Sequence, residues 1–290
     1  MLNYMSVAEI AAQASRQGLS IGRLVLQDQA AQMERSEADI LNEMDENLHV
    51  MERAAKRGLQ PGLRSNSGLT GGDGARMRAH AAHALSGPFC ARAMQIALGT
   101  AECNAAMGRI VASPTAGSCG ILPGAVISMM ENCGVGREDA CLALIAAGGI
   151  GMVIANQARI SGAAGGCQAE CGSAAAMAAA ALVQMAGGNP EMMENAVAMA
   201  LKNLLGLVCD PVAGLVEVPC IKRNAGGVMI AIAAADMALA GIRSVIPVDE
   251  VISAMREVGE SLPCALRETA LGGLAVTPTG QEIKSRIFSK

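Results

Sequence analysis

Ten cysteines are spread along the 290 residues of this chain, and they fall into two groups by their neighbours. Half of them lie in apolar, helix-like runs or at a helix end, where a free thiol packs as a small hydrophobic side chain. The other half have glycine, proline or polar neighbours: Cys119, Cys167, Cys171, Cys209 and Cys220. Glycine and proline hold the backbone in turns, which keeps a sulfur out of regular helix packing. Thiols placed in this way are available as ligands, so the chemistry open to them is metal or cluster binding.

The spacing of these thiols leaves several kinds of site open. There is no Cys-x-x-Cys pair, so neither a zinc ribbon nor a ferredoxin-type run fits. Four thiols, at positions 167, 171, 209 and 220, are enough for a closed tetrahedral zinc site. Three of them, Cys167, Cys209 and Cys220, are enough for an iron–sulfur cluster in which one iron has no protein ligand. The spacing is equally compatible with buried, inert thiols.

Hydroxyl groups form a second candidate site. Residues 111–123 are rich in proline and glycine and carry Ser113, Thr115 and Ser118 just before an apolar helix. Hydroxyls and free backbone N–H groups at a helix N-terminus bind anions such as carboxylates, although plain capping of the helix is the alternative. Residues 67–74 are glycine-rich and fit either a nest of N–H groups for another anion or a surface loop. Neither segment is a phosphate-binding P-loop, because no Gly-Lys-Ser/Thr follows.

The three histidines indicate no catalytic site of their own. His80 and His83 are one helical turn apart but have no third ligand nearby in sequence, and His49 lies on a charged helix. We therefore expect them to be solvated. A general base supplied by another subunit is the possibility that this leaves open.

The elements that must position these groups read as helices throughout. Period-two alternation is hard to find, and the chain has one Tyr, two Phe and no Trp, so strand formers are scarce. Helix starts are marked at Ser6, Ser36 and Asn189, and Gly18 marks a stop. We predict an all-α fold with a single catalytic domain, in which residues 1–62 form an amphipathic helical layer and residues 63–290 the core.

Composition narrows the class of protein. The chain is 52% hydrophobic with 34 Gly and 19 Met, which predicts closely packed helices, and its net charge of −4 argues against nucleic-acid binding. Residues 140–158 and 171–190 are long enough to cross a membrane, but they are rich in Gly or Ala and lack anchoring flanks, so we expect buried helices and no membrane span. No apolar signal segment stands out near residue 1, and we expect a cytoplasmic protein with reduced thiols.

Five segments together give the chain a resemblance to a known family. They are SGLTGGD at 67–73, NAAMGRIVASPTAGSCGILP at 104–123, GAAGGCQAE at 162–170, DPVAGLVEVPCIKRNA at 210–225 and LGGLAVTPTG at 271–280. In these segments the sequence resembles the α subunit of the iron–sulfur-dependent L-serine dehydratases. The resemblance spans most of the chain in order, so it is highly specific.

The resemblance implies a helical domain that carries a [4Fe–4S] cluster on Cys167, Cys209 and Cys220. An iron without a protein ligand would act as a Lewis acid on the hydroxyl of L-serine, and the products would be pyruvate and ammonia. Candidates for seating the substrate carboxylate are Ser113, Thr115, Gly117 and Ser118.

Other site residues are expected to act around this seat. Glu170 is a candidate for holding the substrate ammonium group, and Asn224 for contacting the amino or carboxylate group. Lys222 or Arg223 could offset the charge of the cluster.

The resemblance also implies a partner. Single-chain relatives carry a further domain with a Ser-Ser-His-Thr segment, which this chain lacks. It looks like the two-chain form, so we expect a separate β subunit and little activity without it. Two alternatives remain: a pyridoxal-phosphate dehydratase, which the all-α pattern disfavours, and a non-enzymatic four-thiolate zinc module or helical scaffold.

Overall fold

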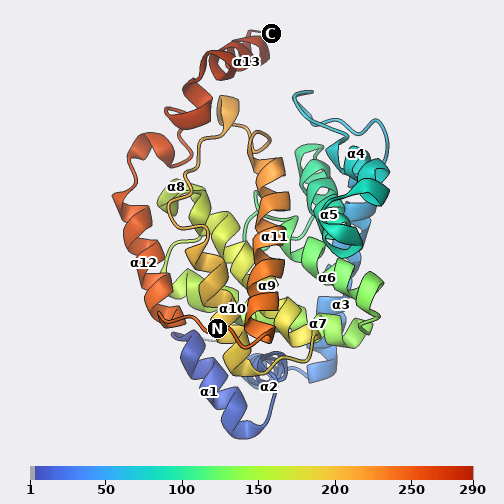
Figure 1. The fold of residues 1–290 in the computed structure, drawn as a ribbon, viewed down its shortest axis with the longest axis vertical. Helices are drawn as coiled ribbons and strands as arrows, with labels where there is room; N and C mark the ends of the chain where they lie inside the picture. Colours follow the sequence, from blue (N-terminus) through green and yellow to red (C-terminus); the bar gives the residue numbers. More distant parts are fainter. Residues whose placement is uncertain (1–3, 290) are drawn as a thin grey trace.

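The computed structural model describes residues 4–289, and all regular secondary structure in this part of the chain is helical (Figure 1). The α-helices are α1 (Val7–Gln17), α2 (Ile21–Met33), α3 (Glu37–Gly58), α4 (Asp73–His80), α5 (Gly87–Ala105), α6 (Ile121–Cys133), α7 (Arg137–Gln157), α8 (Gly162–Gly165), α9 (Ser173–Met185), α10 (Pro190–Lys202), α11 (Cys220–Leu239), α12 (Val248–Ser261) and α13 (Pro278–Phe288). Short turns join them: η1 (Ala81–His83), η2 (Gln168–Gly172, a π-helical turn), η3 (Val212–Gly214), η4 (Cys264–Leu266) and η5 (Gly273–Val276). The predicted all-α fold is confirmed.

Helix α9 is the centre of the molecule. It contacts α6, α7, α10 and α11, and every one of its residues except Gln184 is buried. A helix that is apolar on all sides is stable only when neighbours cover all of it. Because α9 is mostly alanine, four helices can approach its backbone closely.

Helix α7 lies beside α9 and is the one described helix that is long and apolar enough to cross a membrane by length and composition. It packs against α9, α2 and α3, and 72% of its most apolar window is buried. That burial is typical of a core helix. The second apolar stretch, residues 171–190, is divided between η2, α9 and the start of α10.

The N-terminal helices pack directly on this core. Helix α1 contacts α10 and α12, α2 contacts α7, and α3 contacts α5 and α7. Their ends follow the sequence signals: Ser6 caps α1 by accepting a hydrogen bond from the N–H of Glu9, and Gly18 ends the helix with φ 66°. Ser36 and Asp39 form a reciprocal capping box at the start of α3.

Two glycines show why small residues are needed between the helices. Gly58 near the end of α3 meets Gly99 in the middle of α5, and a Cβ on Gly58 would lie 1.7 Å from the carbonyl oxygen of Gly99. No side chain fits at that distance, so the crossing of α3 and α5 depends on this glycine.

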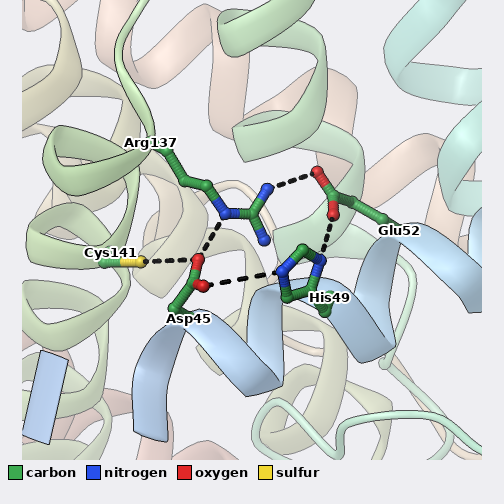
Figure 2. A network of polar contacts seen from close by, with 5 residues as sticks. All are labelled: Asp45, His49, Glu52, Arg137 and Cys141. Atoms are coloured by element: carbon green, nitrogen blue, oxygen red, sulfur yellow. Dashed lines mark hydrogen bonds and ion pairs between the residues drawn. The ribbon is translucent and has the colours of Figure 1, made fainter. Parts of the chain in front are cut away.

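A polar network joins α3 to α7 (Figure 2). Arg137, the first residue of α7, donates hydrogen bonds to Asp45 and, at 2.9 Å, to Glu52. The ring of His49 lies between the same two carboxylates, 3.5 Å from Asp45 and 3.2 Å from Glu52. Both partners of His49 lie on its own helix α3, and the bonds of Arg137 to the same two carboxylates join α3 to α7.

Candidate functional site

Three predicted ligand thiols, distant in sequence, are brought together where η2, the bridge at Cys209 and the start of α11 meet. Burial raises the pKa of Cys209, and the nearby thiols of Cys167 and Cys220 raise it further. Burial also raises the pKa of Cys220 to about 12, again with a contribution from Cys167. Each thiol is thus within electrostatic reach of the other two. Cys167 and Cys209 are buried, and Cys220 is half-buried.

The local sequence explains how each thiol is presented. Cys167 follows Gly166, whose φ of 77° favours glycine, and it precedes the π-helical turn η2. Cys209 lies in an isolated bridge. Its N–H donates to the carbonyl oxygen of Leu266 at 2.8 Å, and its own carbonyl oxygen accepts from the N–H of Glu268 at 2.8 Å. Cys220 follows Pro219 and is the first residue of α11.

A fourth thiol accompanies this group. The sulfur atoms of Cys167 and Cys171 are 3.3 Å apart and share a hydrogen bond. That bond lowers the pKa of Cys167 and raises the pKa of Cys171. Of the two thiols, Cys167 therefore ionises more readily than Cys171.

A single arginine supplies positive charge to the thiols. The pKa of Cys167 is lowered mainly by its hydrogen bond with Cys171 and further by the charge of Arg223. Burial raises the pKa of Cys220, and the charge of Arg223 offsets part of that increase. Arg223 also donates hydrogen bonds to Val208 O at 2.8 Å and to Asp210 at 2.9 Å, which fixes the guanidinium. Of the two cations considered from the sequence, Arg223 is the one beside the thiols.

Two carboxylates lie next to Cys209. A Cβ on Gly162 would be 2.8 Å from the sulfur of Cys209, 2.7 Å from Glu170 Oε2 and 3.2 Å from Glu268 Oε2, so these three groups surround one point. Burial raises the pKa of Glu170, and the charge of Glu268 adds to the increase. Glu268 could not be identified from the sequence, because a lone glutamate in a turn matches no motif.

The hydroxyl-bearing segment lies against Glu170. Thr115 Oγ1 donates to Glu170 at 2.8 Å and is 3.1 Å from the Oγ of Ser118, and a Cβ on Gly117 would be 3.3 Å from Glu170 Oε1. No side chain caps the N-terminus of α6. The Oγ of Ser113 is buried and has no hydrogen-bond partner among the described residues. The structure therefore brings the predicted hydroxyls and Glu170 together, with one hydroxyl still free to bind.

Asn224 is placed differently from the substrate contact expected for it. Its Oδ1 accepts from Gly120 N at 2.8 Å, and its Nδ2 donates to Gly117 O at 2.8 Å and to Cys220 O at 2.9 Å. The side chain is fully buried. Its polar atoms all bind backbone, so the geometry favours a bridge between the hydroxyl segment and α11 over direct contact with a substrate.

The glycine-rich residues 67–74 bind internal anions. The N–H groups of Asp73 and Gly74 donate to the buried carboxylate of Glu102 at 2.7 and 3.1 Å. The hydroxyls of Ser67 and Thr70 each donate to Glu217 at 2.7 Å. The N–H groups of this loop thus bind an anion, as the nest interpretation predicts, but that anion is a side chain of the protein itself.

A pocket of about 850 Å³ opens beside these segments. Ser67, Asn104 and Val216 are part of its wall, and Arg286 of α13 lines it as well. Val216 also packs near Gly117, and Asn104 donates to Ala116 O at 3.2 Å. The hydroxyl segment can therefore be approached from this pocket.

The thiols suit a cluster better than a single ion. Within residues 4–289 no three His, Cys, Asp or Glu side chains converge closely enough to hold one metal ion, which disfavours the four-thiolate zinc alternative. In a cluster of four irons each ligand binds a separate corner, so the thiols need not converge on one point. Three thiols with Arg223 beside them fit such a group, and Gly162 has no Cβ that would clash with the sulfur of Cys209.

Comparison with known proteins identifies the family. A family model described as serine dehydratase alpha chain matches residues 16–275. The chain belongs to this family. One relative is the probable L-serine dehydratase, alpha chain, of Bacillus subtilis. It is 52% identical over 287 residues, which cover 98% of this chain and 95% of the relative. The L-serine dehydratase, alpha chain of Peptoniphilus asaccharolyticus is 44% identical over 98% of this chain and 97% of its own length.

Some relatives of this α chain are considerably longer. The L-serine dehydratase of Streptomyces coelicolor is 40% identical over 91% of this chain, but the match covers only 58% of that protein. In L-serine dehydratase 1 of Escherichia coli the match covers 40%. The α-chain sequence thus occurs both as a protein of its own length and as part of a longer polypeptide.

Proposed function

We propose that this chain is the catalytic subunit of an L-serine dehydratase, which removes water from L-serine and releases pyruvate and ammonia. Two near full-length relatives carry that name with the designation alpha chain. The observation that carries the proposal furthest is the meeting of three thiols, Arg223 and Glu170 at one place, although they come from separate segments.

The group held there would be a [4Fe–4S] cluster on Cys167, Cys209 and Cys220. When bound, it supplies an iron without a protein ligand that withdraws electrons from the substrate hydroxyl and makes it a better leaving group. Burial of the thiols and the charge of Arg223 support this ligand set, because thiolates in a dry site need a positive neighbour.

The chain's own residues would bind and orient L-serine. Ser113, Thr115, Gly117 and Ser118 form the seat for its carboxylate, with the unpartnered hydroxyl of Ser113 as one donor. Glu170, already fixed by Thr115, would accept a hydrogen bond from the ammonium group. Asn224 holds the seat at a constant distance from α11.

A partner subunit would supply the general base. His49 is engaged between Asp45 and Glu52, and His80 and His83 are exposed on the surface around η1. The alpha-chain names and the longer single-chain relatives support a β subunit that completes the site. We place the complex in the cytoplasm, where ligand thiols stay reduced.

Anaerobic purification of the chain, with and without its β partner, tests the proposal. We expect iron and sulfide in equal amounts, a brown colour that fades in air, and pyruvate formation from L-serine only when both chains are present. Cys209→Ala should remove the colour, whereas Cys264→Ala, at an exposed thiol, should keep it. Colourless protein with stoichiometric zinc, or full activity of the single chain, would contradict the proposal.

A further inference from the structure

The glycine-rich loop of residues 67–74 has no role in the function proposed above, yet several side-chain contacts hold it in place. Glu217 is 5% exposed and accepts hydrogen bonds from two side chains of this loop, Ser67 and Thr70. A carboxylate costs free energy when it is removed from water, unless charge-assisted hydrogen bonds compensate. The two hydroxyls supply that compensation, so Glu217 and the loop stabilise each other's positions.

The loop contacts the chain on both sides of Cys220. Glu217 precedes Cys220 by three residues and binds the middle of the loop. Lys222 follows Cys220 by two residues, and its Nζ lies 2.5 Å from the carboxylate of Asp73 at the end of the loop. The turn that presents Cys220 is therefore attached to one loop at two points.

Backbone hydrogen bonds connect these two contacts to the position of Cys220. The carbonyl of Glu217 accepts from Ile221 N at 3.1 Å, which closes the first turn of α11 around Cys220. The carbonyl of Val218 accepts from Val212 N at 2.8 Å and closes the turn on its other side. A shift of Glu217 would consequently move the helix start on which Cys220 lies.

We propose that Glu217 is a positioning residue, which fixes the turn carrying Cys220 by binding Ser67 and Thr70. The inference rests on the proposed function in one respect, that Cys220 is a ligand of the cluster. Loss of the carboxylate frees the turn to open locally, so Cys220 becomes more accessible and the bound group is lost faster.

Alkylation of the full-length chain prepared without iron tests this directly. Iodoacetamide is added to the wild type, Glu217→Gln, Glu217→Ala and Lys222→Gln, and peptide mass spectrometry follows Cys220, with the exposed Cys264 as an internal reference. We expect Cys220 to react about tenfold faster in Glu217→Ala and less so in Glu217→Gln, which keeps one acceptor oxygen. Lys222 is 59% exposed, so its substitution loosens the same turn with little risk to folding. The rate at Cys264 should not change.

Glu131→Gln is the matched control, because Glu131 binds Arg92 on the surface far from this loop in sequence. It should leave the alkylation of Cys220 at the wild-type rate. In the complex with the β chain, Glu217→Gln should lower kcat and speed the release of iron to a chelator, while KM for L-serine stays within about twofold.

The outcomes separate this inference from the proposed function. Equal alkylation of Cys220 in the wild type and in both Glu217 variants would overturn the positioning role. A rise in KM with unchanged kcat would overturn it too, since it would place Glu217 at the substrate. If the wild type binds no iron, the cluster assignment fails, and the alkylation rates still decide whether Glu217 fixes the turn.

Discussion

Thr115 donates a 2.8 Å hydrogen bond to Glu170, although 55 residues separate them in sequence. The bond joins the hydroxyl segment to the turn that follows Cys167, so the proposed seat for the carboxylate and the proposed acceptor for the ammonium group are held as one unit. A substrate with both groups, such as an α-amino acid, would be recognised at two points whose separation is fixed before it binds.

Removing this hydroxyl without changing the shape of the side chain should therefore weaken substrate binding. We expect Thr115→Val to raise KM for L-serine about tenfold, which corresponds to about 1.4 kcal/mol, close to the lower end of the range for a hydrogen bond to a charged group. Steady-state pyruvate formation by the complex measures it. Thr269→Val, which removes an exposed hydroxyl bonded to Cys264 O, is the control and should leave KM unchanged. An unaltered KM in Thr115→Val would exclude Thr115 from the seat.

The buried hydrogen bonds of Asn224 should contribute strongly to the free energy of unfolding. Asn224→Ala leaves the N–H of Gly120 and the carbonyl of Gly117 without their side-chain partner in a fully buried place. We expect a loss of about 3 kcal/mol in the free energy of unfolding, seen as a decrease in Tm of roughly 6–12 °C by calorimetry. Asn132→Ala, at an exposed asparagine of α6 with one backbone contact, should change Tm by less than about 2 °C. A small effect of Asn224→Ala on Tm with a large effect on KM would instead favour the direct substrate contact predicted from the sequence.

The sequence was sufficient for those features that depend on local patterns. The helix starts at Ser6 and Ser36, the all-α class and the burial of the apolar stretch in α7 all follow from short-range signals. The sequence motifs also pointed to the hydroxyl segment and to Cys167. The structure places these two close together, because Thr115 of the segment binds Glu170, which follows Cys167 in the chain.

What could not be predicted depends on pairings between distant segments. Glu268 lies beside Cys209 because of an isolated bridge, which no strand pattern in the sequence predicts. Glu217 binds a loop about 150 residues away in sequence. The glycine-rich loop matched an anion nest, but only the fold reveals that the anion is the chain's own Glu102. Long-range partners of this kind are set by helix packing, which single-sequence patterns do not encode.

Glu102 should make stability depend on pH in a definite direction. Burial raises its pKa, and this outweighs the N–H groups of Asp73 and Gly74, which lower it. A carboxyl with a raised pKa in the folded state stabilises the fold at pH values below its unfolded pKa, and the contribution is lost as the pH rises through the folded pKa. We expect the free energy of unfolding of the wild type to exceed that of Glu102→Gln most at about pH 4 and least at about pH 7. Urea unfolding at each pH measures this difference. A difference in unfolding free energy that stays constant or grows towards neutral pH would show that the carboxylate form is the stable one in this nest.

The contact between Gly58 and Gly99 gives the sharpest test of the packing. A Cβ at residue 58 would lie 1.7 Å from the carbonyl oxygen and 2.2 Å from the carbonyl carbon of Gly99, and neither backbone can yield without separating α3 from α5. Gly58→Ala should therefore cost about 3 kcal/mol, because overpacking against backbone cannot be relieved by a rotamer change. Gly148→Ala is the matched control in α7: its Cβ meets nothing within 4 Å, and replacing a helical glycine should add about 0.5–1 kcal/mol of stability. Thermal unfolding of the two variants should consequently shift in opposite directions. A neutral Gly58→Ala would mean that α3 can move away from α5 at no cost, and the N-terminal layer would then be attached to the core more loosely than this crossing implies.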